Sequence, residues 1–73
     1  MARSQKFYPD SSLIESVDYD DEEMTLTIEF VRGGEYSYAR VSSEVYLAFV
    51  DSPSKGKFFS SEIKDKYPFR KIR

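Results

Sequence analysis

Residues 24–41 read MTLTIEFVRGGEYSYARV, and this pattern predicts a β-hairpin. Apolar and polar side chains alternate from Met24 to Val31, which is typical of a strand with one apolar face. The Gly33-Gly34 pair supplies the positive φ angles that a tight turn needs. Residues 35–41 are therefore expected to return as the partner strand.

The length of the hairpin loop decides where Tyr36 and Tyr38 lie, because residues two apart in a strand share one face. A two-residue loop pairs Val31 with Tyr36 and exposes both tyrosine rings, an arrangement suited to stacking on nucleic-acid bases. A three-residue loop pairs Phe30 with Tyr36 and Ile28 with Tyr38, and it places both rings on the core face. We favour the three-residue loop, since exposing these side chains would be costly in so small a domain.

A further strand is expected upstream of the hairpin, from Leu13 to Tyr19. Ile14 shares the face of Val17 only if a β-bulge intervenes, because the spacing otherwise places it on the opposite face. Asp20 to Glu23 then form a turn into the hairpin. Residues 1–11 are polar and are expected to form a flexible N-terminal arm, which leaves residues 12–73 as the folded domain.

Two helices are expected after the hairpin. The first is capped by Ser42 or Ser43 and ends near Asp51, and the second begins at Ser52-Pro53 and ends before Pro68. The predicted fold class is therefore α+β, a three-stranded antiparallel β-meander followed by two helices packed on one face. The expected core consists of Leu26, Ile28, Phe30, Tyr36, Tyr38, Val45, Phe49, Phe59 and Ile63.

The composition argues against several kinds of site. With no Cys and no His among 73 residues, the chain lacks disulfides and the usual zinc ligands, so its six Phe and six Tyr must supply the core. We expect no catalytic residues, no cofactor and no metal, because no nucleophile with a base and no phosphate-binding loop is visible. An acidic run has calcium-loop spacing, but Glu23 occupies the position that needs glycine. No apolar run marks a signal peptide or a membrane span, so we expect a cytoplasmic protein without a membrane partner.

Opposite charges are concentrated in opposite halves of the chain. Acidic side chains dominate residues 10–29 and basic ones dominate residues 55–73, so a net charge of −2 conceals a strong asymmetry. The asymmetry indicates a contact surface for an anionic partner near the C-terminus. Candidate residues for binding nucleic acid or another anion are Arg40, Lys55, Gly56, Lys57, Lys64, Tyr67, Arg70 and Lys71, with Tyr36 and Tyr38 as candidate stacking residues.

The start of the second helix, Lys55-Gly56-Lys57, has two interpretations. Free backbone N–H groups and the positive end of the helix dipole favour an anion there. Alternatively, Gly56 lets the helix pack closely against the sheet or the first helix, and both lysines are solvated. The tail aromatics Tyr67 and Phe69 likewise form either part of a single-strand nucleic-acid groove or anchors that pin the chain end to the core.

Several short motifs occur together along the chain. They are Ser11-Ser12-x-Ile14, Val17-Asp18-Tyr19-Asp20, Leu26-x-x-x-Phe30, Gly33-Gly34-x-Tyr36-x-Tyr38, Ser54-Lys55-Gly56-Lys57-Phe58-Phe59, Ile63 and Tyr67-Pro68-Phe69. In this combination the chain resembles the KTSC domain, named for the C-terminal region of some lysyl-tRNA synthetases, over about residues 11 to 72. One departure is Asp18, where small residues such as Gly are common in the family. The resemblance implies a small domain that also occurs as a free-standing bacterial or phage protein, with RNA binding as its usually suggested function.

Three functional hypotheses follow. The first is a noncatalytic binding module whose basic second helix and C-terminal tail contact RNA or another nucleic acid, mainly through phosphates. The second is a protein–protein interaction module, a bacterial or phage accessory factor that binds a partner or forms a homodimer. The third is capture of a small anionic nucleotide at the start of the second helix.

Overall fold

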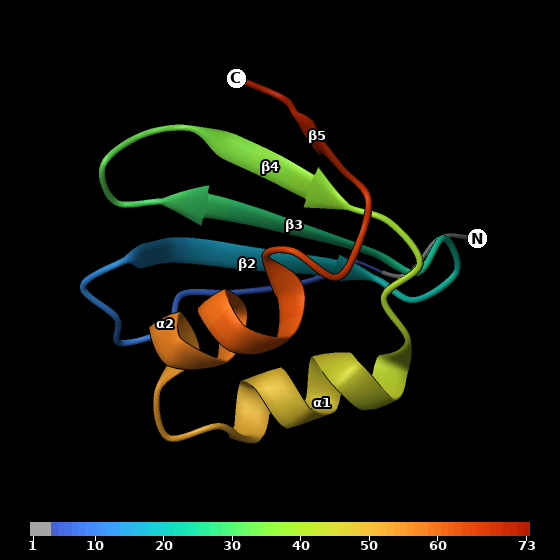
Figure 1. Ribbon diagram of the computed structural model, residues 1–73, viewed down its shortest axis with the longest axis horizontal. Coiled ribbons are helices and arrows are strands. Elements are labelled where there is room, and N and C mark those ends of the chain that lie inside the picture. The colour runs from blue at the N-terminus through green and yellow to red at the C-terminus, as the bar shows by residue number, and fades with distance from the viewer. Residues whose placement is uncertain (1–3) are drawn as a thin grey trace.

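The computed structural model describes residues 4–73, whose five antiparallel strands form one sheet with the helices on one face (Figure 1). No helix in this part of the chain is long and apolar enough to cross a bilayer. The α+β class is confirmed. The strands lie in the sheet in chain order: β1 (Ser4–Phe7), β2 (Ile14–Asp20), β3 (Thr25–Phe30), β4 (Glu35–Tyr38) and β5 (Phe69–Lys71). Three helical segments lie between β4 and β5 in the sequence: α1 (Ser43–Asp51), α2 (Lys55–Phe58) and the π-helix η1 (Phe59–Ile63).

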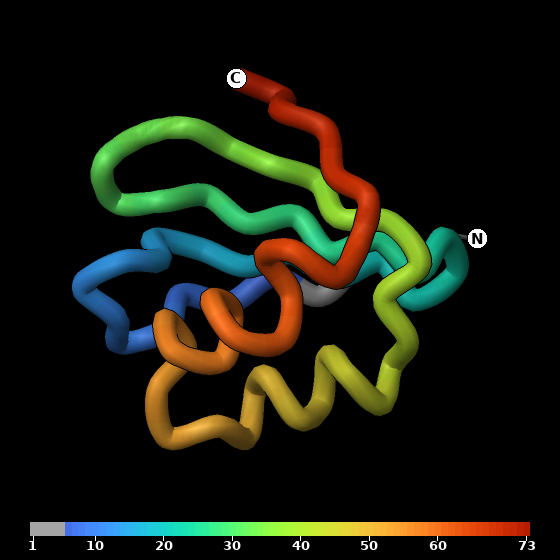
Figure 2. The backbone as a smooth tube through the Cα atoms, in the orientation of Figure 1, coloured from blue at the N-terminus to red at the C-terminus, as the bar shows by residue number. Residues whose placement is uncertain are grey.

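The expectation of three strands was wrong because each edge of the sheet carries a short extra strand. β1 pairs with β2 inside the segment expected to be an arm, of which residues 1–3 lie outside the described part of the chain. β5 pairs with β4 at the opposite edge, where the chain returns after the helices (Figure 2). Segments of four and three residues are too short to show the strand period in sequence.

Contacts outside the two edge strands explain why they form. The Phe7 ring at the end of β1 lies 6.4 Å from the Tyr46 ring and 6.5 Å from the Phe49 ring of α1. Before β5, the Ala39 N–H donates to the Pro68 carbonyl at 2.9 Å and brings the returning chain alongside β4. Both edges are therefore held by contacts between residues that are distant in sequence.

The β3–β4 hairpin has the three-residue loop that was favoured, and Tyr36 and Tyr38 lie on the helix-covered face of the sheet. The pairing differs from the expected one by two residues, because Tyr36 pairs with Ile28 and Tyr38 with Leu26. The loop starts earlier than expected, at residues 31–33, because the Phe30 N–H donates to the Gly34 carbonyl at 3.0 Å and closes it. Gly33 in the loop and Gly34 just after it have φ angles of 105° and 94°. A shift of two residues keeps every side chain on the same face, so the prediction for the tyrosines was correct.

The sequence left open whether β2 contains a bulge, and the structure has one. Ile14 pairs with Phe30 but Ser16 pairs with Glu29, so one extra residue of β2 is accommodated between these two pairs. The bulge brings Ile14, at 1% exposure, onto the same buried face as Val17, at 0%. It also buries Ser16, whose hydroxyl donates to the Glu29 carboxylate at 3.3 Å.

Helix α1 begins after the Ser42 cap as expected, but the second helical segment begins two residues later than predicted. The Ser52-Pro53 pair does not start it, because Ser52 ends α1 by donating its N–H and its hydroxyl to the Phe49 carbonyl. The actual cap is Ser54, and α2 begins at Lys55. The prediction failed because serine closes the end of one helix as readily as it caps the start of the next.

The core lies between the sheet and the helices. Six predicted core residues are buried: Leu26, Ile28, Tyr38, Phe49, Phe59 and Ile63. The other three, Phe30, Tyr36 and Val45, are partly buried and pack against the core. Buried residues absent from the predicted list are Ile14, Val17, Tyr19, Val41 and Tyr46.

Tyr19 joins β2 to the helical layer. Its ring stacks on Tyr46 of α1, with centroids 4.4 Å apart, and its hydroxyl donates to the Val41 carbonyl at 2.6 Å. Because the hydroxyl is buried, this hydrogen bond satisfies a donor that would otherwise be costly to bury.

Candidate functional site

A groove of about 580 Å³ lies between the β3–β4 hairpin, η1 and β5. We call it the aromatic groove. Its volume falls within the usual range for small-ligand sites. The residues that line it are Leu13, Phe30, Arg32, Gly33, Tyr36, Tyr38, Phe59, Ser60, Lys64, Asp65 and Phe69.

Five aromatic side chains form a closed ring of contacts in the aromatic groove. Around the ring, the centroid distances are 5.8 Å for Phe30–Tyr36, 5.8 Å for Tyr36–Phe69 and 5.8 Å for Phe69–Tyr38. The circuit closes with 5.5 Å for Tyr38–Phe59 and 5.3 Å for Phe59–Phe30. Each ring is therefore braced by two others, and the walls of the groove are ordered before any ligand binds.

The burial of these rings is graded from floor to rim. Tyr38 and Phe59 are 4% and 5% exposed, whereas Phe69 is 59% exposed. Tyr36 and Phe30 are half-buried. An incoming planar group could therefore contact Phe69 and Tyr36 without displacing the core.

Strand register and an unusual helical turn bring the rings together. Tyr38 lies directly opposite Phe69, so both side chains emerge from the same face of adjacent strands. Phe59 comes from η1, where the Lys64 N–H donates to the Phe59 carbonyl at 2.9 Å and closes a turn one residue wider than an α-helical turn. Such π turns are rare and are frequently found at functional sites.

Charged side chains surround the apolar walls. Arg32 lies in the hairpin loop, and Lys64 and Asp65 follow η1 at the opposite rim. Among residues 4–73, no hydrogen bond or ion pair holds the side chain of any of these three residues. Lys71 lies opposite Tyr36 in the register, so it shares the face on which the groove opens. The rim is therefore net positive and its charges are free to meet a ligand.

Tyr38 is a neutral hydrogen-bonding group at the floor of the groove. Burial raises the pKa of its phenol above the ordinary value, and repulsion from the Tyr36 phenol once that group is ionised and from the Asp65 carboxylate raises this pKa further. The hydroxyl is consequently protonated at neutral pH.

The structure separates the candidate residues named from the sequence. Tyr36, Tyr38 and Lys64 line the aromatic groove and Lys71 shares its face. Arg70 lies opposite Ser37, so it points to the other face of the sheet. The other candidates lie outside the groove. Arg40 after β4 and Lys57 on α2 are exposed, and Lys55 donates to the Ser52 carbonyl at 2.7 Å. Tyr67 is half-buried beside Val45 and Phe58.

Lys57 and Lys64 were expected to share a helical face because seven residues make two α-helical turns. The wide turn of η1 contains one residue more than an α-helical turn. Lys64 is therefore rotated around the helix axis by about 100° from the position it would have in a regular α-helix. In agreement, Lys64 lines the aromatic groove and Lys57 does not.

Gly56 packs against another part of the chain. A β-carbon built there would lie 3.4 Å from Leu13 Cδ2, so the glycine lies close to the segment before β2. The helix α2 has only four residues, and its first N–H groups include the one that donates to the Ser54 hydroxyl. These contacts favour the packing interpretation of Gly56 over an anion site at this helix start.

The sequence analysis proposed no binding role for seven residues that line the groove: Leu13, Phe30, Arg32, Gly33, Phe59, Ser60 and Asp65. The alternation of rings and cations in the tail had already pointed to Phe69 as part of a nucleic-acid groove. Arg32 had no signal of its own, because a single arginine beside a glycine turn is ordinary in sequence. Phe30 and Phe59 were assigned wholly to the core.

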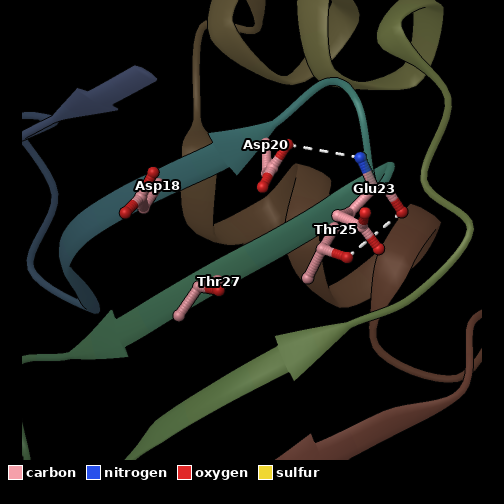
Figure 3. A pocket seen from close by; sticks show the side chains of 5 residues that line it. All are labelled: Asp18, Asp20, Glu23, Thr25 and Thr27. Carbon is pink, nitrogen blue, oxygen red and sulfur yellow. Dashed lines mark hydrogen bonds between the residues drawn. The ribbon is translucent and has the colours of Figure 1, made fainter. Parts of the chain in front are cut away.

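One part of the opposite face of the sheet is acidic. Asp18 and Asp20 from β2, Thr25 and Thr27 from β3, and Glu23 from the intervening turn surround a shallow pocket (Figure 3). The Asp20 carboxylate accepts from the Glu23 N–H at 3.2 Å and so stabilises the turn. Within residues 4–73, no three acidic, His or Cys side chains are arranged to hold a metal ion. This part of the face would repel an anionic ligand.

Comparison with known proteins gives consistent matches. The model of the KTSC domain family matches residues 10–67. A lysine–tRNA ligase of Nostoc punctiforme is 38% identical over 64 residues, which are 88% of this chain but only 11% of the ligase. A protein of Stutzerimonas stutzeri is 35% identical over 57 residues, covering 78% of this chain and 80% of that protein. The crystal structure of a KTSC domain protein from Yersinia pestis superposes with a TM-score of 0.92 at 37% identity, covering 97% of this chain and 100% of that one.

Proposed function

The chain belongs to the KTSC family, and we propose that it is a noncatalytic module that binds single-stranded RNA in the aromatic groove. The closed ring of five aromatic side chains is the observation that carries this proposal. Stacking a base on an aromatic side chain contributes about 1 to 3 kcal/mol, and braced rings lose little entropy on binding. Phe69 and Tyr36 are the accessible stacking surfaces.

Free cations around the groove supply the second part of the argument. Arg32 and Lys64 stand at two rims and Lys71 lies on the same face, so phosphates on either side of a stacked base would meet a positive charge. Asp18, Asp20 and Glu23 lie together on the other face of the sheet, which favours the groove side for an anionic strand. This separation explains how a chain with a sequence pI near 5.0 can still bind a polyanion.

The relatives support RNA over other single strands. The matched segment of Nostoc punctiforme belongs to a protein named as a lysine–tRNA ligase, whose named substrate is an RNA. The chain spans about a tenth of that ligase, so the ligase activity itself is not proposed here. We propose only that the shared segment contributes RNA contacts.

The stacking contribution is tested with Phe69→Ala. The ring is 59% exposed, so its removal should leave the fold intact while weakening the binding of a fluorescein-labelled single-stranded RNA roughly 5- to 140-fold. Tyr8→Ala is the matched control, because Tyr8 is also aromatic, is 68% exposed and lies outside the groove. Equal affinities of the two variants in fluorescence anisotropy would reject the groove as the binding site.

The phosphate contribution is tested by salt dependence. Lys64→Gln should reduce the slope of log K against log salt by about 0.7, the value for one lost contact on a single strand. Lys57→Gln removes a lysine that is also exposed, on the adjoining helix α2, and we expect it to change the slope less because Lys57 lies outside the groove. A larger effect at Lys57 would move the phosphate site to α2. No affinity of the unmodified protein for RNA or DNA at low salt would refute the proposal and favour the protein–protein interaction module.

A further inference from the structure

Base stacking and phosphate contacts alone do not account for the Asp65 carboxylate in the aromatic groove. It is the one carboxylate among the residues that line the aromatic groove, and no partner within residues 4–73 engages it by hydrogen bond or ion pair. A carboxylate repels phosphate, so it weakens a purely electrostatic site. Its presence beside Lys64 is explained if it accepts hydrogen bonds from the ligand.

The two oxygens of a carboxylate match two adjacent donors. Among the four RNA bases, only guanine presents two neighbouring donors on its Watson–Crick edge, the N1–H and the N2 amino group. Guanine O6 lies next to N1 and accepts from a cation. Adenine and cytosine each place an acceptor beside their amino group, and uracil has a single N–H between two carbonyls. A carboxylate with a lysine next to it is therefore complementary to guanine.

The groove provides both groups beside a stacking surface. Lys64 and Asp65 are consecutive at one rim, and Tyr36 and Phe69 form the accessible wall. Arg32 and Lys64 together outnumber Asp65, so the groove disfavours a cationic peptide side chain, which would otherwise suit a carboxylate among aromatic rings.

We infer that the aromatic groove selects a guanine base, with Asp65 accepting from its N1–H and N2 amino group and Lys64 donating to its O6. This inference rests on the proposed function, because the guanine is held as part of a single-stranded RNA. Phe69 and Tyr36 would contact the face of the base. Asp65 would decide which base is bound, while the rings would bind any base.

The test compares RNA pentamers with four uridines and one central guanosine, adenosine, cytidine or inosine, using fluorescence anisotropy on the whole protein. Guanosine should bind roughly 5- to 140-fold more tightly than adenosine or cytidine, the range for a good bidentate contact. Inosine lacks the N2 amino group and should bind with intermediate affinity. Equal affinity for all four pentamers would overturn the inference while leaving the proposed function in place.

Variants separate recognition from stacking. Asp65→Asn should abolish the preference for guanosine, and Phe69→Ala should weaken all four pentamers by a similar factor. Glu62→Gln is the matched control, because Glu62 is an exposed carboxylate on η1 that lines a different groove. A preference for guanosine that survives Asp65→Asn would refute the role of Asp65. Failure of every pentamer to bind at low salt would instead refute the proposed function itself.

A final arm distinguishes the source of the guanine. Guanosine monophosphate alone should bind more weakly than the guanosine pentamer, because it lacks the neighbouring phosphates that the rim cations contact. If the mononucleotide bound as tightly as the pentamer, the strand would contribute nothing, and the inference of a guanine held within RNA would be overturned in favour of a free nucleotide.

Discussion

Replacing Gly56 with alanine should stabilise the protein, although a glycine flanked by two lysines suggests a role in binding. Gly56 lies inside α2, where glycine costs about 0.8 to 1.0 kcal/mol relative to alanine. The added methyl would lie 3.4 Å from Leu13 Cδ2 and 3.7 Å from Leu13 Cβ, which are ordinary van der Waals distances. We therefore expect the free energy of unfolding to rise by about 1 kcal/mol, and Tm by roughly 4 to 8 °C.

Urea denaturation followed by circular dichroism measures this change, with RNA affinity measured on the same samples. Gly34→Ala is the matched control, because Gly34 has a φ of 94° and a β-carbon there would lie 3.4 Å from Tyr36 Cε1. It should destabilise the protein by about 1 to 3 kcal/mol. A loss of stability in Gly56→Ala would refute the packing argument. A stable Gly56→Ala protein with weakened RNA binding would show that the backbone of this glycine does contact an anion.

Other predictions concern the core and the surface. Tyr19→Phe removes the donor to the Val41 carbonyl and leaves that buried acceptor unpaired. The free energy of unfolding, measured by urea denaturation, should therefore fall by about 1 to 3 kcal/mol. Alkaline pH should destabilise the fold, because burial raises the pKa of Tyr19, Tyr38 and Tyr46 in the folded state. As the pH rises, these phenols therefore ionise first in the unfolded state. The free energy of unfolding should be at its full value below about pH 10 and should fall as the pH rises through the folded-state pKa values. Stability measured against pH, with tyrosinate absorbance, checks this sign. Arg73→Ala breaks exposed ion pairs and should change stability by less than about 1 kcal/mol.

The central hairpin and its two faces could be predicted from the sequence. Alternation over residues 24–31 and a glycine turn predicted the hairpin, and the cost of exposing aromatic rings favoured the loop that places Tyr36 and Tyr38 on the helix-covered face, even though the register was two residues off. The spacing of apolar residues left a bulge near Ile14 as an open possibility, and Ser42 was one of two serines expected to cap α1. These features depend on local periodicity and capping, which neighbouring residues encode directly.

The residues that form the candidate site could not be identified without the three-dimensional arrangement of the strands and helices. The edge strands β1 and β5 are too short to carry a periodic pattern, so pairing with distant residues determines whether they form. Once β5 pairs with β4, the adjacent tail cations Arg70 and Lys71 point to opposite faces of the sheet. The wide turn of η1 rotates Lys64 away from Lys57 and into the lining of the aromatic groove, which Arg32 of the distant hairpin loop also lines. A sequence lists which rings and cations are present, but the side of the molecule on which each one emerges depends on strand register and helical phase, and these are set by long-range packing.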